Sequence, residues 1–155
     1  MSEHKAWVEW QLADGDFSAG QYSREHTWRF DGGLSVPASP SPSVVRVPYS
    51  NPAHVDPEEA FVASISSCHM LTFLYLASRR GFVVTRYADE AVGRMTKNER
   101  RVPWVSSVEL HPEIEYGTPR PTPEEETELH HAAHAECFIS NSVKTDIRVA
   151  ARSAP

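Results

Sequence analysis

The sequence predicts an α+β fold in which a mostly antiparallel sheet wraps around a long buried central helix. Residues 60–78 contain no Lys, Arg, Asp or Glu, which is typical of a helix that is buried on all sides. Alternating apolar residues before and after this stretch indicate strands that pair as hairpins. The chain has 155 residues, enough for one hydrophobic core, so we expect a single domain over residues 1–155.

The composition limits the classes of partner. The formal net charge is −6, and no basic run is longer than Arg100-Arg101, so neither nucleic acid nor a membrane is expected as a partner. The first residues lead into a strand-like pattern without the features of a signal peptide, so we expect a cytoplasmic protein. Polar side chains within the apolar stretch also disfavour a lipid environment: Ser64, Ser66, Ser67, His69 and Thr72.

The N-terminal third predicts a hairpin. Residues 5–12 and 21–30 alternate as two strands, and the Asp-Gly-Gly turn at residues 31–33 closes the hairpin. Arg24 is unusual, because the alternation places it on a face that is mostly aromatic: Tyr22, His26, Trp28 and Phe30. The alternative to a functional role is a position at the solvent edge, with the stem of Arg24 packed on Trp28.

A proline-rich passage over residues 37–57 precedes the central helix. It is too long for a simple connection and is typical of loops that are functional or that wrap another surface. Asp56 then provides a helix cap, Pro57 suits the first helical position, and Glu59 completes a capping box. Gly81 offers a left-handed stop for the same helix.

The C-terminal half predicts a second hairpin, a second helix and a closing strand. The second helix has Thr122 as its cap, Pro123 at its first position and Glu125 in a second capping box. The expected elements, in order, are a strand over residues 82–95, a turn at 97–99, a strand over 104–116, a helix over 123–136, a turn at 138–142 and a strand over 145–150.

Cys68 in the middle of the central helix is the first candidate for chemistry. A cysteine is nucleophilic only as a thiolate, and its pKa rises in apolar surroundings. Because the positive end of the helix dipole is distant, a reactive Cys68 requires a cation from elsewhere, for which Arg24 and Arg29 are the strand candidates. His69 points roughly 100° away from Cys68 on a helix and is a poor partner. The alternative is that Cys68 and Cys137 are two unrelated buried thiols.

A second constellation suggests a zinc site. His130, His134 and Cys137 are spaced to share one helix face, and their nitrogen and sulfur atoms suit zinc. Closed zinc sites need a fourth ligand, which the nearby sequence does not provide. Histidines at helical spacing are more often part of a solvated face, so we expect no metal.

Two segments resemble a known family. Residues 56–61, followed by Ser66-Ser67-Cys68, resemble the Asn-Pro-Glu-Glu/Gln-Leu…Ala-Cys segment of the OsmC/Ohr family of thiol-dependent hydroperoxide reductases. Residues 137–143 resemble that family's Cys-Pro-hydrophobic-Ser-Asn/Gln-x-hydrophobic turn, with Phe138 in place of proline. The resemblance covers nearly the whole chain, because the order of the elements and the separation of the cysteines also fit.

The resemblance implies roles for four residues. Cys68 corresponds to the peroxidatic cysteine, Cys137 to the resolving cysteine and Glu58 to the family's glutamate. The family's strand arginine falls on Arg24, but the glycines that flank it in the family are missing here, so Arg29 is the alternative. His130, His131 and His134 are typical of a subgroup rather than of the family.

The implied activity is a cysteine-based peroxidase that acts on organic hydroperoxides or hydrogen peroxide. The Cys68 thiolate attacks the O–O bond and becomes a sulfenic acid, Cys137 condenses with it to a disulfide, and an external dithiol reduces the disulfide. No metal or organic cofactor is required. The alternatives are a redox sensor that lacks turnover and a zinc-binding protein.

A homodimer is also expected. Glu58 and Cys68 lie roughly 15 Å apart along one straight helix, so they cannot touch directly. Either Arg24 spans part of this distance or a second subunit contributes to each site, and we favour the second subunit because an uncharged helix needs more cover than a small sheet gives. The resemblance likewise implies an intertwined homodimer with sites at the interface.

Overall fold

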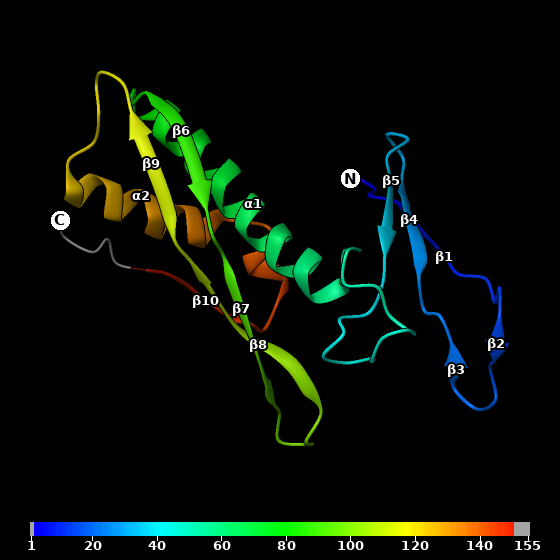
Figure 1. Cartoon of the computed structure of the whole chain (residues 1–155). Helices are drawn as coiled ribbons and strands as arrows, with labels where there is room; N and C mark the ends of the chain where they lie inside the picture. The colour runs from blue at the N-terminus through cyan, green and yellow to red at the C-terminus, as the bar shows by residue number, and fades with distance from the viewer. Residues whose placement is uncertain (1, 151–155) are drawn as a thin grey trace. The chain divides into compact units, whose positions relative to one another are not determined.

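The structure, a computed structural model, describes residues 2–150 (Figure 1). Contacts divide it into two compact units, which we call the N-terminal unit (up to Ala60) and the C-terminal unit (from Phe61). The single domain expected from the length stays a prediction, because each unit is defined by its own contacts. The described elements are β1 (Ala6–Glu9), β2 (Gly15–Asp16), β3 (Gln21–Tyr22), β4 (His26–Phe30), β5 (Ser35–Ala38), α1 (Pro57–Arg79), β6 (Val84–Asp89), β7 (Val92–Lys97), β8 (Pro103–Leu110), β9 (Pro112–Tyr116), α2 (Pro123–Glu136), a 3-10 turn η1 (Ser140–Ser142) and β10 (Asp146–Val149).

The N-terminal unit contains an antiparallel sheet in the order β1-β4-β5 and a short β2-β3 hairpin. The expected pairing of the first two strands is present, since Val8 lies opposite Trp28. The expected strand over residues 21–30 is wrong in one respect: β3 and β4 are separated by residues 23–25. Arg24 therefore lies in this irregular segment and not in a continuous row of aromatic side chains.

The turn at residues 31–33 closes a different hairpin from the expected one. It joins β4 to β5, and Gly33 adopts the left-handed backbone (φ 88°) that this turn requires. The sequence pattern missed β5 because Pro37 lies inside it. Proline is tolerated there because β5 is an edge strand.

The proline-rich passage folds back on β5. Ala38 and Val55 form a parallel bridge, and Ser39 N donates to Val55 O at 3.0 Å. The buried Ser39 hydroxyl accepts the Asn51 N–H at 2.8 Å, and Ser50 Oγ donates to Val45 O at 2.6 Å. These bonds satisfy polar groups of a long loop in which Val44 and Val47 remain exposed.

Helix α1 begins as the sequence predicts. Glu59 N donates to Asp56 Oδ1 at 2.7 Å and Asp56 N donates to Glu59 Oε2 at 3.1 Å, which is the expected capping box. Gly81 (φ 81°) follows the helix with the predicted left-handed conformation. By length and composition alone α1 could span a membrane, a property that core helices of globular proteins share.

The expected burial of α1 on all sides is wrong for the single chain. One stripe is buried, made of Ile65, His69, Phe73 and Ala77 at four-residue spacing. Leu71 and Tyr75 on another face are 61% and 60% exposed. Within the described residues, the buried stripe of α1 therefore lies on one side of the stretch from Ala60 to Ser78, which carries no charged side chain.

The C-terminal unit contains one long hairpin that is interrupted midway. Strands β6 and β9 pair antiparallel, as do β7 and β8, and β10 lies parallel to β8. The interruption falls at Glu90 and Ala91 on one side and at His111 on the other. The Asp89 carboxylate holds this break, because it accepts the His111 N–H at 2.6 Å and a hydrogen bond from Ser66 of α1.

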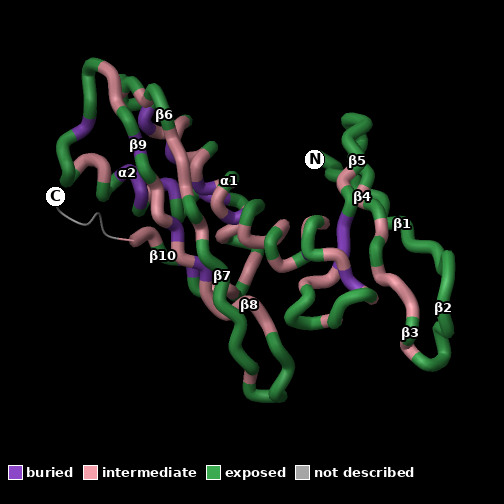
Figure 2. The backbone as a smooth tube through the Cα atoms, viewed as in Figure 1, coloured by how far each residue is buried: buried purple, intermediate pink, exposed green. Residues whose placement is uncertain are grey.

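Two hydrophobic clusters join α1 to this hairpin. One contains Phe73, Ile114 and Leu129 and packs α1 against α2, β6 and β9. The other contains Ile65, Val108 and Ile147 and packs α1 against β8 and β10. Both helices are thereby fixed against the same set of strands, and buried segments appear along α1 and α2 in Figure 2.

Candidate functional site

The structure brings Cys68 and Cys137 together. Their sulfur atoms are 2.7 Å apart, and both cysteines are free thiols. A disulfide has a sulfur–sulfur distance of about 2.05 Å, so less than 1 Å of movement separates this pair from a bond. Cys137 is fully buried, whereas Cys68 is partly exposed. Cys68 is therefore the sulfur of the pair that a dissolved molecule can reach.

Two helices place the sulfurs. Cys68 lies in the middle of α1, where the Thr72 hydroxyl donates to its carbonyl at 2.9 Å. Cys137 is the C-cap of α2, with an extended backbone (φ −66°, ψ 121°) that turns the chain out of the helix. Asn141 fixes the turn that follows, because its Nδ2 donates to the carbonyls of Ala135 and Cys137, both at 2.9 Å. These are carbonyls that the end of a helix leaves without partners.

The same turn directs backbone N–H groups at both sulfurs. Ile139 N donates to Cys68 Sγ at 3.5 Å, and Ser140 N donates to Cys137 Sγ at 3.4 Å. The Ser140 hydroxyl is buried and makes no hydrogen bond within the described residues, although it lies close enough to the Cys137 sulfur to lower its pKa. Ser140 and Ile139 are site residues that our sequence analysis did not assign; their signal was membership in the Cys-x-x-Ser-Asn turn.

The two thiols lose their protons unequally. Burial raises the pKa of Cys68, and the neighbouring Cys137 thiol raises it further. Burial also acts to raise the pKa of Cys137, but the hydrogen bonds from Cys68 and from Ser140 outweigh it and leave that pKa lowered. One thiol donates to the other's thiolate, so the first proton leaves readily and the second is retained.

Arg24 belongs to the N-terminal unit, where its guanidinium is ordered. It donates to Tyr22 O at 2.7 Å and to Gly20 O at 3.2 Å, and it stacks over the Tyr22 ring at 3.9 Å. The Arg24 N–H also donates to Tyr49 O in the proline-rich passage, at 3.0 Å. The half-buried side chain is therefore held by main-chain acceptors and aromatic faces, and within residues 2–150 none of its hydrogen bonds is to a carboxylate.

Arg29 and Glu58 also lie in the N-terminal unit. Arg29 forms an exposed ion pair with Glu9 at 3.6 Å and stacks over Trp7 at 5.4 Å. Glu58 lies in the first turn of α1, which continues without a break to Arg79. Glu58 and Cys68 are therefore separated by ten residues of regular helix, which keeps them from direct contact within one chain. The functions expected of Arg24 and Glu58 stay predictions.

The zinc constellation does not assemble. Within residues 2–150, no three His, Cys, Asp or Glu side chains lie where they could hold a metal ion. His130 Nδ1 instead lies 3.0 Å from His69 Nε2, and Cys137 faces Cys68. The sequence pattern failed here because His130 is paired with His69, and Cys137 with Cys68, instead of turning to a common ion.

Comparison with known proteins now decides the family. The sequence profile described as OsmC-like protein matches residues 50–152. A solved structure of an OsmC-like protein of unknown function from Vibrio cholerae is 49% identical, covers 97% of this chain and 99% of its own, and has a TM-score of 0.93. The chain belongs to the OsmC-like family.

More distant OsmC-like structures share the fold. An organic hydroperoxide resistance protein from Elizabethkingia anophelis is 21% identical, with a TM-score of 0.71 over 96% of this chain and 93% of its own. The organic hydroperoxide resistance protein OhrB of Bacillus subtilis is 16% identical, with a TM-score of 0.65 over 96% of each chain. A search of curated proteins finds no match. The predicted α+β, OsmC-like fold is confirmed.

Proposed function

We propose that this OsmC-like protein is a thiol-dependent peroxidase that reduces organic hydroperoxides, and also hydrogen peroxide, in the cytoplasm. The observation that carries the proposal is the pair of free thiols with sulfurs 2.7 Å apart, one partly exposed and one buried. The names of two structures with the same fold, both organic hydroperoxide resistance proteins, support it.

In the first step, Cys68 acts as the nucleophile because it is the more exposed of the two cysteines. The thiolate attacks the terminal oxygen of ROOH, so an S–O bond forms while the O–O bond breaks. The electron pair leaves with RO⁻, which takes a proton to become ROH. Cys68 is oxidised to a sulfenic acid and the peroxide is reduced to an alcohol.

In the second step, Cys137 attacks the sulfenic sulfur. The S–S bond forms, the S–O bond breaks, and the oxygen leaves as water with the Cys137 proton. The 2.7 Å separation means that this step requires little movement of either helix. An external dithiol then reduces the disulfide, forming its own disulfide and returning two thiols to the protein.

A cation beside Cys68 completes the proposal, because burial alone raises the pKa of this thiol. We assign this role to Arg24, which is ordered and half-buried, over Arg29, which is exposed and ion-paired. Glu58 would hold the guanidinium. A homodimer would cover the exposed face of α1 and let a second subunit contribute to each site.

The test is peroxide consumption with dithiothreitol as the reductant. Cumene hydroperoxide and hydrogen peroxide are compared for the wild type, Cys68→Ser and Cys137→Ser. The proposal predicts catalytic turnover in the wild type and its loss in both variants, with one equivalent of peroxide still consumed by Cys137→Ser. Full turnover by Cys68→Ser would contradict it.

A redox sensor is the second candidate, favoured by the raised pKa of Cys68, which slows attack on peroxide. A sensor would consume a single equivalent of peroxide in the wild type and would accumulate as the disulfide even with excess dithiothreitol.

A further inference from the structure

The turn after α2 has a property that the peroxidase proposal does not use. Three successive residues, Phe138, Ile139 and Ser140, follow the buried Cys137 and lead into η1. Ile139 N lies 3.5 Å from Cys68 Sγ and Ser140 N lies 3.4 Å from Cys137 Sγ. The Phe138 N–H acts on the same sulfur, since it lowers the pKa of the Cys68 thiol. Successive N–H groups that converge from a turn form a concave site for an anion.

We propose that the N–H groups of Phe138, Ile139 and Ser140 form an anion-binding nest that holds Cys68 and Cys137 as a unit of one thiol and one thiolate. The inference rests on the proposed function only for its consequence in peroxide reduction. The N–H groups of the nest would stabilise one thiolate in the pair. A cation beside Cys68 would then determine whether Cys68 or Cys137 is the thiolate.

The nest is rigid for reasons visible in the structure. Asn141 N donates to Cys137 O at 3.1 Å, and the Asn141 side chain closes the end of α2. Ser142 N donates to Ile139 O at 2.9 Å, and Ser142 Oγ donates to Phe138 O at 2.7 Å. The carbonyls of the turn are therefore engaged on one side, which leaves the N–H groups directed toward the sulfurs.

The surroundings of the sulfurs are free of competing charge effects. The titratable residues of α1, α2 and β6 include His69, Asp89, His130 and His134, and within residues 2–150 none of these four moves the pKa of either thiol. The shifts come from burial, from the other thiol, from Ser140 and from the backbone N–H groups. A single negative charge shared by two sulfurs is what this environment stabilises.

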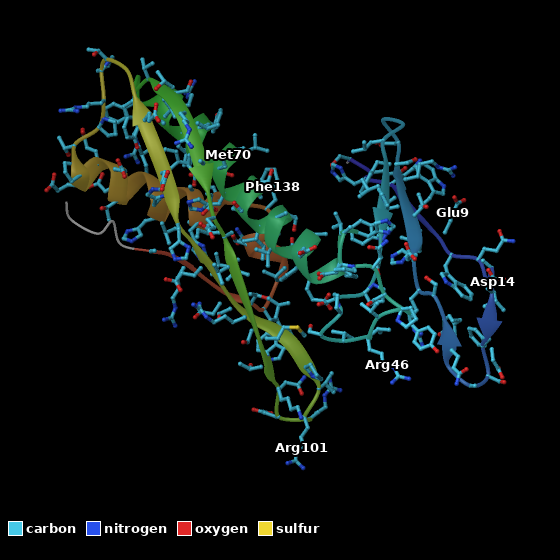
Figure 3. All side chains as sticks on the ribbon, in the orientation of Figure 1. Glu9, Asp14, Arg46, Met70, Arg101 and Phe138 are labelled. Carbon is cyan, nitrogen blue, oxygen red and sulfur yellow. The ribbon has the colours of Figure 1, made fainter. Side chains whose placement is uncertain are left out.

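One substitution removes a single donor of the nest. Phe138→Pro deletes the Phe138 N–H, and the extended backbone of Cys137 (ψ 121°) suits a residue that precedes proline. Phe138→Ala is the matched control, because it keeps the N–H and removes only an exposed side chain. Phe138, which is labelled in Figure 3, is 84% exposed.

The experiment is a titration of thiolate ultraviolet absorbance between about pH 4 and pH 11, with Cys68→Ser/Cys137→Ser as the baseline. The wild type should ionise in two separate steps, the first below the ordinary cysteine pKa. Phe138→Pro should reduce the thiolate fraction near neutral pH by about tenfold, the effect of one hydrogen bond to a charged group, while Phe138→Ala should not change it. Equal effects of the two variants would overturn the proposal.

The Cys68→Ser variant allows the pKa of Cys137 to be measured alone, and this measurement does not depend on the folding of Phe138→Pro. In this variant Cys137 keeps its nest contact, so its pKa should stay below that of an ordinary cysteine. An ordinary or raised pKa would overturn the nest. Because no peroxide is present, failure of the nest is distinct from failure of the peroxidase, which would show as normal thiolate formation without turnover.

Discussion

His69 Nε2 lies 3.0 Å from His130 Nδ1. The two imidazole rings are stacked, with an interplanar angle of 9° and centroids 5.4 Å apart. Both histidines are buried, and His69 Nδ1 makes no hydrogen bond within the described residues. Burial lowers the pKa of His69 to about 4, with the charge of His134 acting in the same direction. The pair therefore ties α1 to α2 while His69 remains neutral.

This neutral His69 predicts a pH dependence of stability. The unfolded chain binds a proton at His69 below about pH 6.5, whereas the folded chain does so only near pH 4. The difference in His69 pKa between the folded and unfolded chain contributes on the order of 3 kcal/mol to the free energy of unfolding. This contribution is complete above pH 6.5 and is lost as the pH falls to about 4. Urea unfolding of the wild type and His69→Phe should show a shallower pH slope for the variant in this window. Equal slopes would contradict a depressed His69 pKa.

Gly93 of β7 predicts a steric coupling with α1. A methyl group at this position would overlap Cγ2 of Val62, so the side chain or the strand must shift. We expect Gly93→Ala to lower the unfolding free energy by about 1–3 kcal/mol. The double variant Gly93→Ala/Val62→Ala should cost less than the sum of the single variants, because the smaller side chain leaves room. Strict additivity in urea unfolding would show that the two residues do not meet.

The assignment of the cation predicts unequal effects of two arginines. Arg24→Met should lower the second-order rate of Cys68 oxidation by about 10²–10³-fold, the usual effect of losing one preorganised charge at a reacting group. Arg29→Met removes an equally charged residue of the same unit whose ion pair with Glu9 is exposed, so its rate should stay within about twofold of wild type. Stopped-flow oxidation by cumene hydroperoxide measures both rates. A larger loss in Arg29→Met would transfer the role to that residue.

The exposed face of α1 predicts a dimer. Leu71 and Tyr75 are 61% and 60% exposed on a helix without charged residues between positions 60 and 78. Placing Glu at both positions should halve the mass measured by light scattering, because a buried unpaired charge is strongly unfavourable. Ser78→Glu, at an exposed position near the end of the helix, is the control and should leave the mass unchanged. A monomeric wild type at all concentrations would remove the basis of the prediction.

Local signals predicted local structure well. The two capping boxes, at Asp56 with Glu59 and at Thr122 with Glu125, are present as expected, because each depends on side chains three residues apart. The second hairpin was also predicted, but its interruption was not. Apolar alternation continues through the break, and the Asp89 carboxylate that stabilises it acts on His111, distant in sequence.

Tertiary features were predicted less completely. The apolar composition of α1 predicted burial on all sides, but composition does not distinguish cover by the chain's own strands from cover by another surface. The proximity of Cys68 and Cys137 came from resemblance to a family motif and not from spacing. The N–H groups of residues 138–140 carry no side-chain signal, so sequence reasoning could not assign them.

Disulfide formation between the two cysteines can be followed by intact mass spectrometry of the reduced protein after one equivalent of cumene hydroperoxide. Closing the 2.7 Å gap between the sulfurs of Cys68 and Cys137 predicts a single chain that is lighter by about 2 Da, with both thiols lost together and the original mass restored by dithiothreitol. A chain that keeps both thiols, or that instead gains oxygen atoms at Cys68 while Cys137 stays free, would contradict the account.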